Sequence, residues 1–85
     1  MSDPVSVIVP ARNEAQTIGR VVGQLRDMAG IAEVVVIDNA STDATAARAE
    51  AAGARVVAEA RPGMGHAVRT GTRAARHDWV MKVDA

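Results

Sequence analysis

The segment from Glu33 to Asp38, with the sequence EVVVID, restricts the fold of this chain more than any other feature. Its four central residues are all β-branched, and β-branched residues are enriched in strands. Because the run has no polar face, the strand must be covered on both sides, as strands of parallel sheets are. The segment therefore predicts an α/β fold in which helices cover both faces of a sheet.

Three further segments have strand patterns, and they lie at 5–9, 55–59 and 78–84. Segments with helical patterns separate the strands, and strands that alternate with helices imply right-handed crossovers between parallel strands. We therefore predict a single α/β domain over residues 1–85, with a Rossmann-like parallel sheet of about four strands.

The predicted helices lie between these strands. The first begins at a capping-box-like pair, Asn13 and Gln16, and its apolar residues recur at helical spacing. The second is rich in Ala, is capped by the polar side chains of residues 41–43 and runs to about Ala52. The third covers about 65–76 and is weakened by glycine. Each helix is long enough to connect two parallel strands.

Composition and charge exclude several classes of partner and site. The chain has 85 residues with 10 basic and 10 acidic side chains, so it carries no net field that would attract nucleic acid or an anionic membrane. Cysteine is absent, which excludes disulfides and thiolate metal sites. We find no signal-peptide pattern and no apolar stretch of the ~20 residues needed to cross a bilayer. We therefore expect a cytoplasmic chain with no nucleic-acid partner and no membrane segment.

Polar or glycine-containing segments follow each predicted strand. They are residues 10–14 (PARNE), 38–43 (DNASTD), 61–65 (RPGMG) and Asp84. In an open parallel sheet, ligands bind at the carboxyl ends of the strands. The four segments are therefore expected to meet at one binding edge, and this convergence is a stronger signal than any one of them.

Taken singly, most of these residues also have a structural explanation. Asp38 either caps the following turn or accepts a hydrogen bond from a base or ribose. Ser41 and Asp43 are more typical of helix caps than of ligands. The Gly63–Gly65 turn would let backbone N–H groups approach a phosphate, although it lacks the third glycine of a dinucleotide fingerprint. Asp84 is well placed for a metal ion, although hard cations take several oxygens.

In their order along the chain, the segments VSVIVPARNEAQTIGRVV, EVVVIDNASTDATA, GMGHAV and WVMKVDA resemble family 2 glycosyltransferases, which have the GT-A fold. Within that family the chain looks like the bacterial branch that includes dolichyl-phosphate mannose synthases and glucosyl-3-phosphoglycerate synthases. The resemblance covers the whole chain but only the N-terminal part of a typical member. It implies a partial nucleotide-sugar-binding domain that stops after the first acid of a D-x-D motif.

The resemblance also implies roles for particular residues. Pro10, Arg12 and Glu14 match the loop that lines the base and ribose of the sugar donor. Asp38 and Asn39 match an acidic pair that reads the base, but here the second member is an amide. That departure leaves the preferred base in doubt.

Two glycines and one acid complete the set of matches. Gly63 and Gly65 match a glycine-rich turn near the diphosphate, and Asp84 matches the first acid of the D-x-D motif. The implied cofactor is Mg²⁺ or Mn²⁺, which neutralises charge on the leaving group. The implied partner is a UDP- or GDP-linked sugar, while the acceptor and the stereochemistry stay open. Lys82 lies two residues before Asp84, so both side chains point to the same side of the strand. Lys82 could approach a phosphate, but a solvent-reaching position at the edge is more typical of lysine.

Three alternatives remain open. A catalytically incompetent nucleotide-binding fragment would share every motif. A sugar nucleotidyltransferase has a related fold, but its first loop is rich in glycine, whereas the PARNE loop has none. A purely structural α/β module leaves the convergence of polar segments unexplained. In every case an exposed parallel sheet edge invites self-association.

Overall fold

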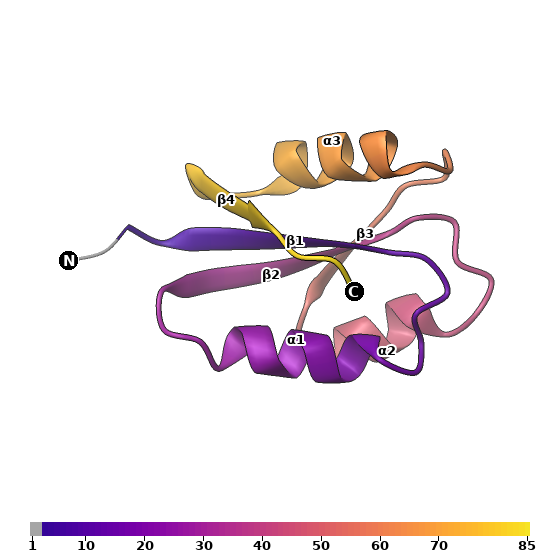
Figure 1. The fold of residues 1–85 in the computed structure, drawn as a ribbon, viewed down its shortest axis with the longest axis horizontal. Helices are drawn as coiled ribbons and strands as arrows, with labels where there is room; N and C mark the ends of the chain where they lie inside the picture. Colours follow the sequence, from indigo (N-terminus) through magenta and orange to yellow (C-terminus); the bar gives the residue numbers. More distant parts are fainter. Residues whose placement is uncertain (1–2) are drawn as a thin grey trace.

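The computed structural model describes residues 3–85 as a four-stranded parallel sheet between two layers of helices (Figure 1). The α/β class and the four strands predicted from the sequence are confirmed. None of the helices in the described part of the chain is long and apolar enough to span a membrane. In chain order the elements are β1 (Val5–Ala11), α1 (Ile18–Arg26), β2 (Ile31–Asp38), α2 (Thr45–Ala51), β3 (Arg55–Ala58), α3 (Met64–Ala74) and β4 (Trp79–Lys82).

The two central strands of the sheet, β1 and β2, carry the core. The strand order is β3-β2-β1-β4, and the register runs from Ser6 opposite Glu33 to Ala11 opposite Asp38. Alternate side chains pack into different layers, which explains why EVVVID has no polar face. The layer of α1 and α2 buries Val7, Val9, Val34 and Val36, and the layer of α3 buries Ile8, Val35 and Ile37.

The predicted start of the first helix is wrong, and of the predicted caps of the second helix only Asp43 contacts its first residue. The first helix, α1, begins at Ile18 with Thr17 as its N-cap, and Asn13 lies in the preceding loop with a φ of 53°. The second helix, α2, begins at Thr45 after an N-cap residue that has no capping side-chain bond. The polar residues before each helix instead bond mainly to the neighbouring loop, because the two loops lie against each other at the carboxyl edge of the sheet.

The strand β4 lies at the edge of the sheet beside β1. All of its residues are exposed, and the exposed fractions of Trp79, Val80 and Met81 are 61%, 38% and 45%. The strand ends at Lys82, earlier than predicted, although Val83 still donates a hydrogen bond to the Ile8 carbonyl at 3.0 Å. An apolar, unpaired edge therefore lies on the surface of the described residues.

Candidate functional site

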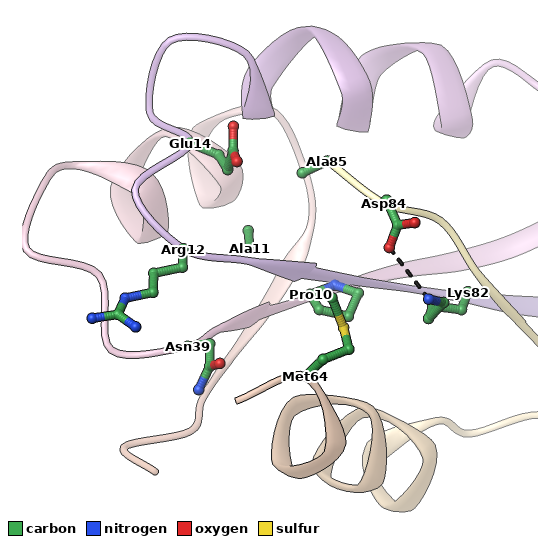
Figure 2. Close-up of a pocket in the computed structure, with 9 residues that line it drawn as sticks. All are labelled: Pro10, Ala11, Arg12, Glu14, Asn39, Met64, Lys82, Asp84 and Ala85. Carbon is green, nitrogen blue, oxygen red and sulfur yellow. Dashed lines mark hydrogen bonds and ion pairs between the residues drawn. The ribbon is translucent and has the colours of Figure 1, made fainter. Parts of the chain in front are cut away.

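A pocket of about 330 Å³ opens at the carboxyl ends of β1, β2 and β4. Figure 2 shows side chains from four separate segments around it. Its lining consists of Pro10, Ala11, Arg12, Glu14, Asn39, Met64, Lys82, Asp84 and Ala85. The fold thus brings together residues that are far apart in the sequence, at the edge where a parallel sheet binds ligands.

Most of the predicted site residues line this pocket, and three do not. The residues in the lining are Pro10, Arg12, Glu14, Asn39 and Asp84. Asp38 and Gly63 instead form hydrogen bonds within the surrounding loops, and Gly65 lines a separate hollow on α3 with His66 and Arg69. The sequence did not single out Met64 as a lining residue, because an apolar side chain in a turn carries no chemical signal.

The loop after β1 is held by residues that follow β2. The backbone N–H of Asn13 donates to Ser41 Oγ at 3.0 Å, and the backbone N–H of Thr42 donates to the Asn13 side-chain oxygen Oδ1 at 2.8 Å. The next amide, Glu14 N–H, donates to Thr45 Oγ1 at 2.9 Å. Asn13 can serve both loops because asparagine tolerates the left-handed backbone better than most residues. The Glu14 side chain therefore projects into the pocket from a fixed backbone.

The Asp43 carboxylate ties the same loops to α2. Its Oδ2 accepts a hydrogen bond from the Ala15 amide at 3.3 Å, and its Oδ1 accepts bonds from the Thr45 amide at 3.0 Å and from the Thr45 hydroxyl. The bond from the Thr45 hydroxyl is the largest cause that lowers the pKa of Asp43 below its ordinary value. Asp43 thus combines the predicted contact to the helix start with a loop contact that the sequence pattern did not indicate.

The Asn39 side chain is buried, with 6% of its surface exposed, and its amide is fully engaged. Its Nδ2 donates to the carbonyl oxygens of Glu59 at 3.1 Å and Arg61 at 2.7 Å, while its Oδ1 accepts from the Gly63 amide at 3.1 Å. An aspartate here could not donate either bond. Asn39 therefore shapes the turn that leads into α3.

The Glu59 carboxylate supports the same turn, and the sequence did not predict this role. It accepts hydrogen bonds from the Arg61 guanidinium at 2.9 and 3.2 Å, from the Arg61 amide at 2.8 Å and from the Thr70 hydroxyl at 2.6 Å. The Arg61 guanidinium is the largest cause that lowers the pKa of Glu59 to about 2. The only signal in the sequence was an acid at the end of a strand, two residues before an arginine.

On the opposite side of the pocket, Lys82 and Asp84 lie next to each other, with 3.3 Å between Lys82 Nζ and Asp84 Oδ1 (Figure 2). The two side chains thus point toward each other, although Asp84 lies beyond the end of β4 and not on the strand as predicted. Asp84 is largely exposed, so its carboxylate is open to a ligand or a metal ion. Residues 3–85 contain no group of three His, Cys, Asp or Glu side chains that could hold a metal ion. Asp84 thus offers one carboxylate ligand, and a bound ion would need further oxygens.

The pocket combines positive charge with hydrogen-bond acceptors. Arg12 and Lys82 supply positive charge, while Glu14 and Asp84 supply hydrogen-bond acceptors. An open parallel α/β sheet with a pocket at its carboxyl edge is a Rossmann-like type of fold. Within this class, residues 6–85 match the family model Glycosyl transferase family 2. The chain therefore belongs to glycosyl transferase family 2.

Known proteins resemble the chain over most of its length. It is 49% identical over 67 residues to the glycosyltransferase AglJ of Haloferax volcanii. That match covers 79% of this chain and 22% of that relative. The chain is 40% identical over 91 residues to the glucosyl-3-phosphoglycerate synthase of Mycolicibacterium paratuberculosis. That match covers 95% of this chain and 28% of that relative. The chain thus spans less than a third of the length of these two relatives.

A solved structure extends the similarity to three dimensions. The glucosyl-3-phosphoglycerate synthase of Mycobacterium tuberculosis, in complex with Mn²⁺, UDP-glucose and phosphoglyceric acid, superimposes with a TM-score of 0.88 at 35% identity. The match covers 98% of this chain and 33% of that one. The chain accordingly has the fold of the corresponding third of a GT-A enzyme.

Proposed function

We propose that this chain forms the donor-binding part of a glycosyltransferase that uses a UDP- or GDP-linked sugar. The observation that carries the proposal is the pocket at the carboxyl edge, which combines Arg12 and Glu14 on one side with Lys82 and Asp84 on the other. The complex of the similar mycobacterial synthase with UDP-glucose and Mn²⁺ supports it. The first side would receive the base and ribose, and the second would receive the diphosphate.

The loop residues would act by contact and by positioning. Pro10 and Arg12 line the pocket beside the proposed position of the base and ribose. Asp38 uses Oδ1 to accept the Ser41 amide at 3.2 Å, and its Oδ2 forms no hydrogen bond with residues 3–85, so that oxygen is available to a base or ribose. Asn39 would act indirectly, because its amide holds the turn before α3. Gly65 would offer its N–H group in the first turn of α3 to a phosphate, because that turn leaves its amides without helical partners.

We propose Asp84 as a ligand of Mg²⁺ or Mn²⁺. Its exposed carboxylate at the end of the fourth strand suits one position of such an ion, and the diphosphate would supply other oxygens. When bound, the ion would neutralise charge that develops on the leaving diphosphate. Lys82 would release Asp84 and pair with a phosphate oxygen instead, so the 3.3 Å pair is the resting arrangement.

A nucleotide-binding fragment without catalysis is the second candidate. The two candidates share the donor site and differ in sugar transfer. We propose sugar transfer only for a protein as long as these relatives. Its acceptor would be a small molecule, a polyprenyl phosphate or a glycan.

Thermal unfolding of the chain with UDP, GDP, ADP or NAD, each with and without Mn²⁺, tests the donor site. We expect UDP or GDP to raise the melting temperature and Mn²⁺ to increase the effect, because a ligand that binds only the folded state stabilises it. Asp84→Asn should remove the contribution of Mn²⁺. The matched control Asp78→Asn changes an exposed carboxylate outside the pocket and should retain it. Selective stabilisation by NAD would overturn the proposal.

A further inference from the structure

A second pocket lies at the opposite, amino end of the sheet and has a volume of about 400 Å³. Three arginines from three different parts of the fold face it. Arg26 is the last residue of α1, Arg55 is the first residue of β3, and Arg76 follows α3. The lining is completed by Ile31, Ala32, Glu33, Val34 and Gly53. The sequence patterns assigned no role to these three arginines.

Only one of the three positive charges has a carboxylate partner. Glu33, the single acid in the lining, pairs with Arg55 at 3.1 Å. Its other oxygen accepts hydrogen bonds from Ser6 Oγ at 2.6 Å and from the Arg76 amide at 2.7 Å. Within residues 3–85, neither Arg26 nor Arg76 forms an ion pair with its side chain. The pocket therefore carries a surplus of positive charge.

Few of the N–H donors of these three guanidinium groups form hydrogen bonds within the fold. Arg26 donates one bond, to the Ala52 carbonyl at 3.1 Å, and Arg55 donates to the Ala74 carbonyl at 2.6 Å, so both satisfy oxygens at helix ends. A guanidinium has five N–H donors. The Arg76 side chain forms no hydrogen bond within residues 3–85, and Arg55 Nε is buried without an acceptor there. Capping of helix ends thus explains only part of the cluster.

The backbone at Gly53 accommodates one of these arginines. Gly53 has a φ of 106°, and a Cβ added there would lie 2.6 Å from Arg26 Cζ. A larger residue would therefore displace the Arg26 guanidinium from the pocket wall. Glycine at this position leaves room for the guanidinium against the backbone between α2 and β3.

We propose that this pocket binds a phosphate-type oxyanion, at the end of the sheet opposite the donor site. Guanidinium groups match the geometry of phosphate oxygens and form short, charge-assisted hydrogen bonds with them. The lining offers two guanidiniums without carboxylate partners and no free carboxylate to repel an anion. The same chemistry fits a free or small-molecule phosphate and the phosphate of a lipid headgroup.

The test is an NMR titration of the chain with inorganic phosphate at constant ionic strength. We expect saturable shifts of the amides of residues 31–34, Gly53 and Arg76. Arg76→Gln should weaken binding by about tenfold, since it removes a charged donor. It should leave the fold intact, because the Arg76 side chain forms no hydrogen bond within the described residues. The control Arg20→Gln removes an exposed charge from α1 outside the pocket and should bind as the parent does.

Vesicles with and without anionic phospholipid separate the two sources of phosphate. Binding to free phosphate alone identifies a soluble anion, whereas vesicle binding that phosphate competes away and that Arg76→Gln weakens identifies a headgroup. Shifts that do not saturate, shifts centred on Met64 and Lys82 at the donor site, or equal losses in Arg76→Gln and Arg20→Gln would each overturn the proposal. None of these outcomes depends on nucleotide binding at the carboxyl edge.

Discussion

The Gly63 amide donates a hydrogen bond to Asn39 Oδ1 at 3.1 Å and thereby joins the loop after β2 to the turn before α3. Two further bonds from Asn39 Nδ2 reach the carbonyl oxygens of Glu59 and Arg61. The side chain thus satisfies three backbone groups that lie 20 to 24 residues further along the chain. The family resemblance implies an acid at this position. The three contacts of Asn39 explain why this chain has an amide there.

We predict that Asn39→Asp lowers the free energy of unfolding by about 2 kcal/mol, because it leaves two carbonyl oxygens without a donor and brings a carboxylate against them. Denaturant unfolding measures the loss. The control Asp38→Asn changes charge at the neighbouring residue and keeps an oxygen for the Ser41 amide, so it should cost much less. Equal stability of Asn39→Asp and the parent would show that the turn does not depend on this amide.

The Glu33 carboxyl should make stability depend on pH. Burial alone would raise its pKa, but hydrogen bonds from Ser6, the Arg76 amide and Arg55 outweigh burial and lower the pKa from 4.5 to about 2. An acid whose pKa is lower in the folded state stabilises that state above its ordinary pKa, and the stabilisation is lost as the pH falls through the folded value.

The free energy of unfolding should therefore decline as the pH is lowered from about 4.5 to about 2. Glu59, whose pKa is also lowered to about 2, contributes over the same window. Urea unfolding across this range measures the decline. In Glu33→Gln the decline should be shallower than in the parent, and parallel curves for the two proteins would refute the assignment.

Two helical glycines should respond differently to alanine. A Cβ at Gly23 in α1 would meet nothing within 4 Å, whereas a Cβ at Gly71 in α3 would lie 3.1 Å from Ile37 Cγ1 and from Ile8 Cδ1. Gly23→Ala should stabilise the fold by about 1 kcal/mol, through helix propensity alone. At Gly71 the same gain is offset by crowding in the core. Thermal unfolding of both variants should place Gly71→Ala below Gly23→Ala, and the reverse order would contradict the packing of α3 on the sheet.

The fold could be predicted because its main determinants are local patterns. The run Val34–Ile37 requires two apolar environments, and the alternation with helices then requires a parallel sheet. Lys82 and Asp84 also lie together as predicted, although Asp84 lies beyond the end of β4 and strand alternation alone does not place it.

The loops could not be predicted in the same way, because their polar residues bond across the chain. Asn13 was expected to cap the helix that follows it, yet it pairs with Ser41 and Thr42, nearly thirty residues away. A side chain that can cap a helix can equally accept any nearby amide. Only the spatial arrangement of the two loops decides between these partners, and a single sequence does not encode that arrangement in a local pattern.

The exposed edge of β4 should make the chain self-associate. Its outer side has no strand partner within residues 3–85, and Trp79, Val80 and Met81 expose apolar surface along it. Such an edge pairs readily with another strand, and a charged side chain on it opposes pairing. Val80→Lys should therefore raise the dissociation constant by about tenfold or more, since like charges would face each other between copies. Sedimentation velocity over a range of concentrations measures this constant.

Met28→Lys adds the same charge at an exposed apolar residue that precedes β2 and should leave association unchanged. A chain that stays monomeric at every concentration, or equal effects of the two substitutions, would show that this edge does not mediate association.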